Sequence, residues 1–238
     1  MTTANLLVEL FTEELPPKAL KKLGAAFAAL IADSLKAQGL AADAAAVVDF
    51  ATPRRLAVRV ASVATKAADK ALKTKLMPVS VALDADGQPT QALLKKLAAM
   101  GLDESAVARL TREGEGKAEA VFIDTVATGV TLADGLQKAL SEAIAKLPIP
   151  KIMQYQLTDG WTSVNFVRPA HGLVALHGAD IVPVSALGLE SGRRTRGHRF
   201  EAQAAEFDLR DADSYETQLR DTGAVIASFA ARRAEIVR

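Results

Sequence analysis

Apolar residues recur along the chain in two periods, and these predict its first elements. Residues 5–12 (NLLVELFT) are apolar and rich in β-forming types, which predicts a strand. Over residues 20–35, large apolar residues recur every three or four positions, which predicts an amphipathic helix. Pro16 and Pro17 suit the start of that helix, where a missing N–H is tolerated, and Gly39 suits its C-terminal cap.

The same patterns predict elements along the rest of the chain. Residues 46–64 predict two strands joined by a turn at residues 52–54, because apolar residues alternate after the turn. Pro148 and Pro150 cannot continue a helix, so they end the one that precedes them. The other predicted elements are an extended Lys-rich segment at 69–83, a turn at 84–90, a helix at 91–100, a strand at 120–127, a helix from a Thr131 cap to about Lys146, strand-like segments over 161–189 and a helix over 215–238.

Strands and helices that do not alternate regularly indicate an α+β fold, with largely antiparallel sheets, packed helices and two subdomains. We expect an N-terminal α+β segment at 1–65, a Lys-rich and helical middle segment at 66–150, and a strand-rich segment with an Arg-rich loop and a C-terminal helix at 151–238. One continuous domain is the alternative. The last helix ends without Gly, Pro or a polar tail, so we expect the natural chain to continue past residue 238.

Composition narrows the classes of function. Half of the 238 residues are hydrophobic and 5% are aromatic, and formal net charge is +1, so any nucleic-acid contact must rest on local patches. There is no cysteine, which excludes disulfides, thiolate zinc sites and a cysteine nucleophile. Neither a signal peptide nor a membrane span is predicted, and we expect a cytoplasmic protein without a membrane partner.

Basic residues gather in two segments. Residues 51–100 hold nine Lys or Arg against three acids, and residues 151–200 hold six against three. The densest stretch is SGRRTRGHRF at 191–200, where arginines beside two glycines favour contact with an RNA backbone. The alternative is a solvated turn whose arginines pair with Glu190 or Glu201. The candidates in this stretch are Arg193, Arg194, Arg196, His198 and Arg199.

Three further arginines join these RNA-binding candidates. Arg54 and Arg55 follow Pro53 in TPRR, and Arg168 lies in FVRPAH. A solvated hairpin tip, or arginines that satisfy buried carbonyl groups, are the alternatives for these positions.

Acidic residues and histidines permit a second kind of site. Glu13 and Glu14 lie between a strand and a helix, where the helix dipole favours negative charge. With His171 or His198 they could also perform acid–base chemistry on a small molecule, provided that the groups share one cleft. The histidine spacing does not favour a metal site, and the chain has no Gly-rich phosphate loop or nucleophile elbow. We therefore assign no catalytic residue and no metal ligand.

Six motifs occur in an order that resembles the β subunit of bacterial heterotetrameric glycyl-tRNA synthetase. They are LLVELFTEELPPKAL, FATPRRLAV, DADGQPTQA, LPIPKIM, FVRPAHGLVAL and TRGHRF, and the resemblance runs from Leu6 to about Phe200 and more weakly to Arg238. The chain departs from the family at Gln154, where a basic residue is common, and at Gly172, where Trp is common.

The resemblance implies the N-terminal region of a subunit that joins glycine to tRNA(Gly) with ATP, through glycyl-adenylate. In the family the α subunit carries the adenylation site, with its ATP and Mg2+, and the subunits assemble as α2β2. The β subunit binds tRNA, with its anticodon-binding region beyond residue 238. No cofactor is then expected in this chain, which is expected to be inactive alone. Its Arg-rich motifs would position tRNA or, in the alternative, the chain would only pack against the α subunit.

Overall fold

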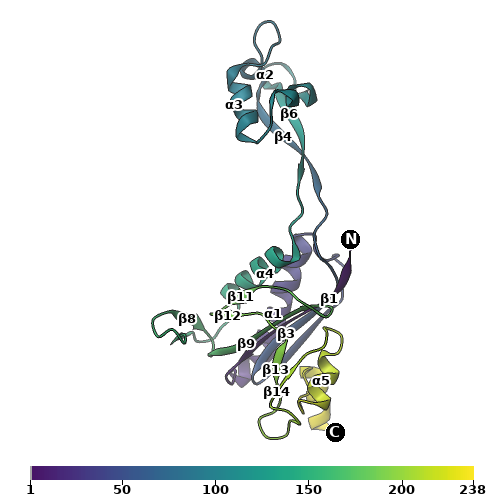
Figure 1. Ribbon diagram of the computed structural model, residues 1–238, viewed down its shortest axis with the longest axis vertical. Coiled ribbons are helices and arrows are strands. Elements are labelled where there is room, and N and C mark those ends of the chain that lie inside the picture. The colour runs from purple at the N-terminus through teal and green to yellow at the C-terminus, as the bar shows by residue number, and fades with distance from the viewer. Residues whose placement is uncertain (1) are drawn as a thin grey trace. The chain divides into compact units, whose positions relative to one another are not determined.

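A computed structural model describes residues 2–238 and divides them into two compact units (Figure 1). Unit 1 combines the chain up to Ala67 with Val130–Arg238, and unit 2 is Ala68–Gly129. Unit 2 is therefore an insertion within unit 1. Unit 1 contains residues from all three of the segments expected from the sequence, 1–65, 66–150 and 151–238. The structure has helices and mostly antiparallel sheets, as predicted for an α+β fold.

Unit 1 is built on a five-stranded antiparallel sheet with β1 at its centre. β1 pairs with β3 on one side, where Val8 lies opposite Val58, and with β9 on the other, where Val8 lies opposite Ala175. The predicted strand pair around residues 52–54 is confirmed as the β2–β3 hairpin. The order across the sheet is β10 (Asp180–Ile181), β9 (Ala170–His177), β1 (Thr3–Thr12), β3 (Arg55–Ala64) and β2 (Val47–Thr52).

Both faces of this sheet are covered. Leu6, Val8 and Leu10 face a core shared with α1 (Pro17–Ala37) and α4 (Leu132–Lys146). Leu7 belongs to a second core on the opposite face, with Tyr215 of α5 (Tyr215–Asp221). Figure 1 shows α1 and α4 on one side of the strands and α5 on the other. A strand buried on both faces carries apolar residues on both, which explains the apolar run Leu6–Phe11 of β1, interrupted by Glu9.

The two long helices of unit 1 form as their sequences predict. Leu23, Phe27 and Ile31 are fully buried at the helical spacing that predicted α1, and Gly39 follows that helix at a φ of 76°. The Thr131 hydroxyl accepts a hydrogen bond from the backbone N–H of Asp134 at 3.3 Å, which confirms the predicted cap of α4.

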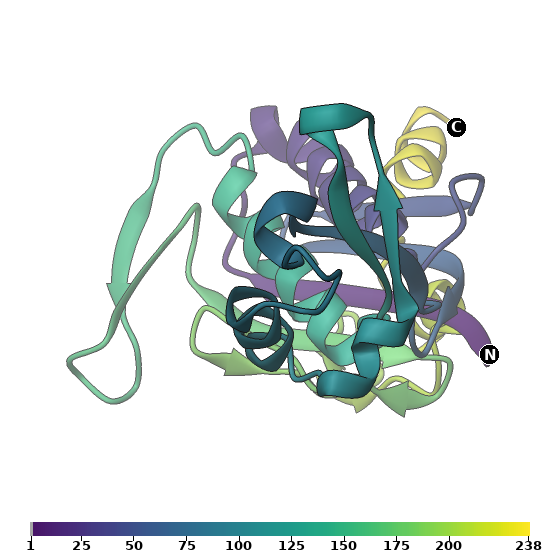
Figure 2. The same ribbon diagram turned by 90° about the horizontal axis from the view of Figure 1, so that it is seen from above.

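The rest of unit 1 consists of short hairpins and a C-terminal helix. The hairpin of β7 and β8 extends away from the remainder of the unit in both views (Figures 1 and 2). The strand-like segments predicted over 161–189 are confirmed, as the eight-residue strand β9 and several shorter strands. The remaining elements of unit 1 are β7 (Met153–Gln156), β8 (Ser163–Phe166), β11 (Ser185–Ala186), β12 (Leu189–Glu190), β13 (Arg194–Arg196), β14 (Glu206–Asp208) and the C-terminal helix α6 (Phe229–Val237).

Unit 2 has its own small core beneath a three-stranded sheet. The core contains Leu76, Leu93, Leu97, Val121 and Ile123. The strand at 120–127 and the helix near 91–100 are confirmed. The sheet order is β4 (Lys70–Pro78), β6 (Ala120–Ala127) and β5 (Leu110–Glu113), with α2 (Val79–Ala82), α3 (Gln91–Ala99) and the 3-10 helices η1 (Glu104–Arg109) and η2 (Gly116–Ala118).

Two predicted elements are wrong in part. Residues 79–82 form the short helix α2 and do not continue the extended segment. The helix predicted over 215–238 is interrupted, because Ala224 takes a φ of 52° and Ala227 turns into the second core. Ser228 then caps a separate helix, since its hydroxyl accepts from the N–H of Ala231 at 3.2 Å.

The close approach of α1 to β2 yields a test of this packing. A Cβ added at Gly24 would lie 2.6 Å from the Cβ of Ala51. Helix propensity alone would make Gly24→Ala stabilising by about 1 kcal/mol. We expect a net loss of about 1–3 kcal/mol in the free energy of unfolding, because the helix must move off the sheet. Denaturant unfolding measures this change.

Ala29→Gly, on the exposed side of the same helix, is the control for propensity. It should lose roughly 0.5–1 kcal/mol by propensity alone. A Gly24→Ala variant more stable than the wild type would contradict the close packing.

Candidate functional site

Three of the motif loops meet at one end of the large sheet. The backbone N–H of Thr12 donates to Arg54 O at 2.7 Å, and that of Leu15 donates to Pro53 O at 2.6 Å. The N–H of Glu13 donates to Pro169 O at 2.9 Å. The segments TEELPP, TPRR and VRPAH, distant in sequence, therefore form one surface, because β1 lies between β3 and β9.

Glu13 joins two of these loops by its side chain. One carboxylate oxygen lies 2.8 Å from His171 Nε2, and the other lies 3.5 Å from Arg54 Nη2. Arg168 donates to backbone carbonyls instead, from Nε to Glu14 O at 3.0 Å and from Nη1 to Val167 O at 2.8 Å. Its guanidinium thus satisfies carbonyl groups, which was the alternative to RNA contact at this position.

Beneath this surface lies a buried network around Glu9. The Glu9 side chain is 1% exposed, and its Oε1 accepts from the hydroxyl of Thr195 at 2.5 Å. Its Oε2 accepts from the Tyr215 hydroxyl and lies 3.9 Å from Arg55 Nε. Burial raises the pKa of Tyr215 well above its usual value, and the neighbouring charge of Glu9 raises it further.

Arg55 is part of this network and not of the surface. Its side chain is 2% exposed, and Nη2 donates to Arg196 O at 2.5 Å. A guanidinium so buried cannot reach a phosphate, so we remove Arg55 from the RNA-facing candidates. The ring of Phe11 lies 5.0 to 5.7 Å from the guanidinium carbons of Arg54, Arg55 and Arg196, which adds cation–π attraction.

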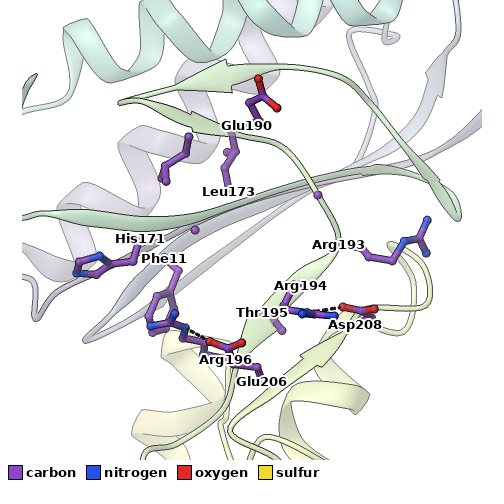
Figure 3. Close-up of a pocket in the computed structure, with 13 residues that line it drawn as sticks. Phe11, His171, Leu173, Glu190, Arg193, Arg194, Thr195, Arg196, Glu206 and Asp208 are labelled. Carbon is purple, nitrogen blue, oxygen red and sulfur yellow. Dashed lines mark hydrogen bonds and ion pairs between the residues drawn. The ribbon is translucent and has the colours of Figure 1, made fainter. Parts of the chain in front are cut away.

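A cleft opens beside the hairpin of β13 and β14 (Figure 3). Arg194 Nε lies 3.0 Å from Asp208 Oδ1, and Arg196 Nε lies 2.8 Å from Glu206 Oε1. The Arg194 hydrogen bond lowers the pKa of Asp208. The cleft has a volume of about 470 Å³ and is lined by residues of β1, β9 and the hairpin, among them Phe11, His171, Arg194, Thr195, Arg196 and Asp208.

The other candidates of SGRRTRGHRF differ in their surroundings. Arg193 lines the cleft but donates to backbone carbonyls, Ala179 O at 2.7 Å and Leu209 O at 3.3 Å. His198 Nδ1 accepts from the N–H groups of Phe200 and Glu201, at 3.3 and 3.2 Å. Solvent therefore reaches mainly the side chains of Arg194, Arg196, His198 and Arg199.

The acid–base alternative meets its distance requirement only in part. Glu13 and His171 are within hydrogen-bond distance, but their side chains are 48% and 38% exposed. His171 lines the cleft and Glu13 does not. Water at such a pair screens the charges, and we interpret the contact as a tie between loops. Within residues 2–238, no three potential His, Asp or Glu ligands gather to hold a metal ion.

Sequence reasoning missed the residues that hold the candidates in place. Phe11, Thr195, Tyr215 and Asp208 were not singled out. Glu9 did carry a signal, because a charge inside a strand buried on both faces must be matched by partners. The partners themselves could not be found, since Thr195 and Tyr215 lie 186 and 206 positions away in sequence.

Comparisons with known proteins agree with one another. A sequence model of the family described as "Glycyl-tRNA synthetase beta subunit" matches residues 6–238. The chain is 68% identical over 238 residues to a protein of Leptothrix cholodnii and 66% identical to one of Thiobacillus denitrificans, both named "Glycine--tRNA ligase beta subunit". All of this chain is covered in both, but only 33% and 34% of the relatives. The chain thus spans about a third of their length.

The buried phenol yields a test of the network. Tyr215→Phe should lower the free energy of unfolding at neutral pH by about 1.5–3 kcal/mol, because the buried carboxylate loses a donor. Because the folded-state pKa is raised, the stability that the phenol contributes is complete below pH ~10 and falls as pH rises further. The variant should lack that alkaline fall, which urea unfolding between about pH 8 and 11 measures.

Tyr155→Phe is the control, since its hydroxyl accepts a hydrogen bond from the N–H of Ala170 and has no contact with Glu9. It should keep the alkaline fall of the wild type. The same fall in Tyr215→Phe would contradict the raised pKa.

Proposed function

Since the chain belongs to the glycyl-tRNA synthetase beta subunit family, as its motifs predict, we propose that it helps to bind tRNA(Gly) and to assemble the α and β subunits. The whole enzyme, an α2β2 assembly, then glycylates tRNA with ATP, and adenylation takes place on the α subunit with its Mg2+. This chain positions the tRNA and carries out no chemical step itself. Positioning assists the reaction, because holding a substrate in a reactive geometry lowers the barrier.

One observation carries the RNA part of the proposal. Arg194 and Arg196 alternate with buried Thr195 on β13, so both arginines project from the same face of the hairpin. Their side chains are 67% and 46% exposed. Each uses Nε for its ion pair with β14, and the exposed ends of the guanidinium groups remain for phosphate oxygens.

The ion pairs of the hairpin also fit this role. The ion pairs with Asp208 and Glu206 already restrict the two arginine side chains in the absence of RNA, so less side-chain freedom is lost on binding. Because the pairs are exposed to solvent, they are weak, and a phosphate can share the guanidinium without a large penalty.

A second candidate is a packing role against the α subunit, favoured by an exposed apolar hairpin. Trp161 is 84% exposed at the turn between β7 and β8, and Ile152 and Met153 are 64% and 39% exposed near its other end. The Asp159 carboxylate accepts from the N–H groups of Trp161 and Thr162, so the turn is held in place. Exposed tryptophan is typical of protein contacts. We propose that this hairpin serves assembly and that β13–β14 serves RNA.

Salt dependence tests the RNA role directly. We expect the logarithm of the affinity for a tRNA(Gly) transcript to fall linearly with the logarithm of salt concentration. The variant Arg194→Ala/Arg196→Ala/Arg199→Ala should reduce that slope by about 1 for each phosphate that it no longer binds. Filter binding over a salt series measures both quantities.

The control is Arg210→Ala/Arg220→Ala/Arg238→Ala, which removes the same number of arginines, 74%, 66% and 82% exposed and each in an ion pair. It should change the slope little. Equal losses in the two variants, or binding that ignores salt, would contradict the proposed site and favour the packing role alone.

A second experiment tests where adenylation occurs. The chain alone should not exchange pyrophosphate into ATP in the presence of glycine, because it lacks a recognisable phosphate loop. Addition of the α subunit provides the positive control. Exchange by the chain alone would show chemistry in this chain and revive the acid–base alternative.

A further inference from the structure

We propose that the tip of the β13–β14 hairpin, formed by His198, Arg199 and Phe200, is a stacking site for an unpaired nucleobase. The proposal rests on the proposed function, because it takes RNA as the ligand. It adds the kind of contact and the kind of RNA, namely a single-stranded segment whose bases can leave a helical stack.

Phe200 stands apart from the other phenylalanine side chains. Its ring is 81% exposed, and within the described chain every other phenylalanine is buried or half-buried. Phe27, Phe50 and Phe166 are fully buried in the cores of unit 1. Among the described residues only Phe200 and Trp161 expose an aromatic ring to this extent, at 81% and 84%, and Phe200 belongs to none of the three cores.

The tip is a built structure and not a frayed loop. The N–H of His198 donates to Gly223 O at 2.6 Å, and the N–H of Gln203 donates to Thr222 O at 2.9 Å. Gly197 lies so close to Gly223 that an added Cβ would be 2.7 Å from the Gly223 Cα. The loop is thus fixed on the end of α5 on both sides of Phe200.

His198 fixes the backbone of the tip at Phe200. Its Nδ1 accepts from the N–H of Phe200 at 3.3 Å and from that of Glu201 at 3.2 Å. A neutral imidazole that accepts at Nδ1 carries its proton on Nε2, which can donate a hydrogen bond to a ligand. The His198 and Phe200 rings meet edge to face, with centroids 6.3 Å apart.

The neighbours of Phe200 favour a nucleotide over an apolar protein surface. The guanidinium carbon of Arg199 lies 5.7 Å from the Phe200 centroid. Exposed aromatic rings beside arginine bind single strands by stacking on the base while the cation attracts the backbone. The residues next to Phe200 in sequence, His198, Arg199 and Glu201, are polar, so they do not extend the ring into an apolar patch. Arg196 and Arg194 continue from the tip along β13 and would bind the phosphates that follow the stacked base.

Phe200→Leu tests the stacking, because it keeps an apolar side chain and removes the aromatic face. The probe is a single-stranded RNA of about eight nucleotides that carries 2-aminopurine, beside the tRNA(Gly) transcript. We expect the affinity for the oligonucleotide to fall about 5- to 100-fold. The salt slope should stay at its wild-type value, because every arginine that binds phosphate is still present. Phe200→Trp should restore the affinity and the quenching of 2-aminopurine fluorescence.

Ile236→Ala is the matched control, since Ile236 is 80% exposed on α6 and should not alter RNA binding. Unchanged affinity and quenching in Phe200→Leu, with a lowered slope in the triple arginine variant, would overturn the stacking site and leave the proposed function intact. Absence of RNA binding in the wild-type chain would overturn both. A Phe200→Leu variant that binds RNA normally but no longer binds the α subunit would assign the tip to a protein contact.

Discussion

The buried carboxylate of Glu9 is the constraint on which the rest of unit 1 depends. It lies inside the central strand, shielded from water on both faces of the sheet, so it must be compensated by donors and a positive charge. The compensation comes from three separate elements, through Arg55 of β3, Thr195 of β13 and the Tyr215 hydroxyl of α5. One buried charge therefore specifies where the hairpin and the second-face helix attach to the sheet.

The attachment of β13 to Glu9 determines which arginines are exposed and which are buried. Because Thr195 points inward to Glu9, its neighbours Arg194 and Arg196 must point outward on a strand with a two-residue repeat. Arg55 turns inward on β3 and holds the backbone carbonyl of Arg196. The arginines of the two Arg-rich motifs thus differ in role. Arg55 supports the interior, and Arg194 and Arg196 place positive charge on the surface. The position of the surface arginines therefore follows from the buried contact between Thr195 and Glu9.

Local patterns in the sequence were enough to predict much of the fold, because helix periodicity, caps and the turn between β2 and β3 are properties of neighbouring residues. Those local patterns could not predict contacts between residues that are distant in sequence. Glu13 and His171 are 158 positions apart, and only the placement of β1 between β3 and β9 brings them together. The interruption between α5 and α6 was missed for a related reason, since burial of Ala227 overrides the helical tendency of its segment.

The insertion of unit 2 has a consequence for how unit 1 assembles. β9 cannot join β1 until the whole insertion has been synthesised, so the sheet depends on closing a long loop. Lys70 and Ala127 lie opposite each other at one end of the β4–β6 pair, and the N–H of Ala67 donates to Val130 O at 2.8 Å. An insertion that folds first therefore presents its two ends side by side. Part of the entropy of loop closure is then lost within unit 2, in favourable local contacts, and the loop that must still close before β9 reaches β1 is shorter by the length of the insertion.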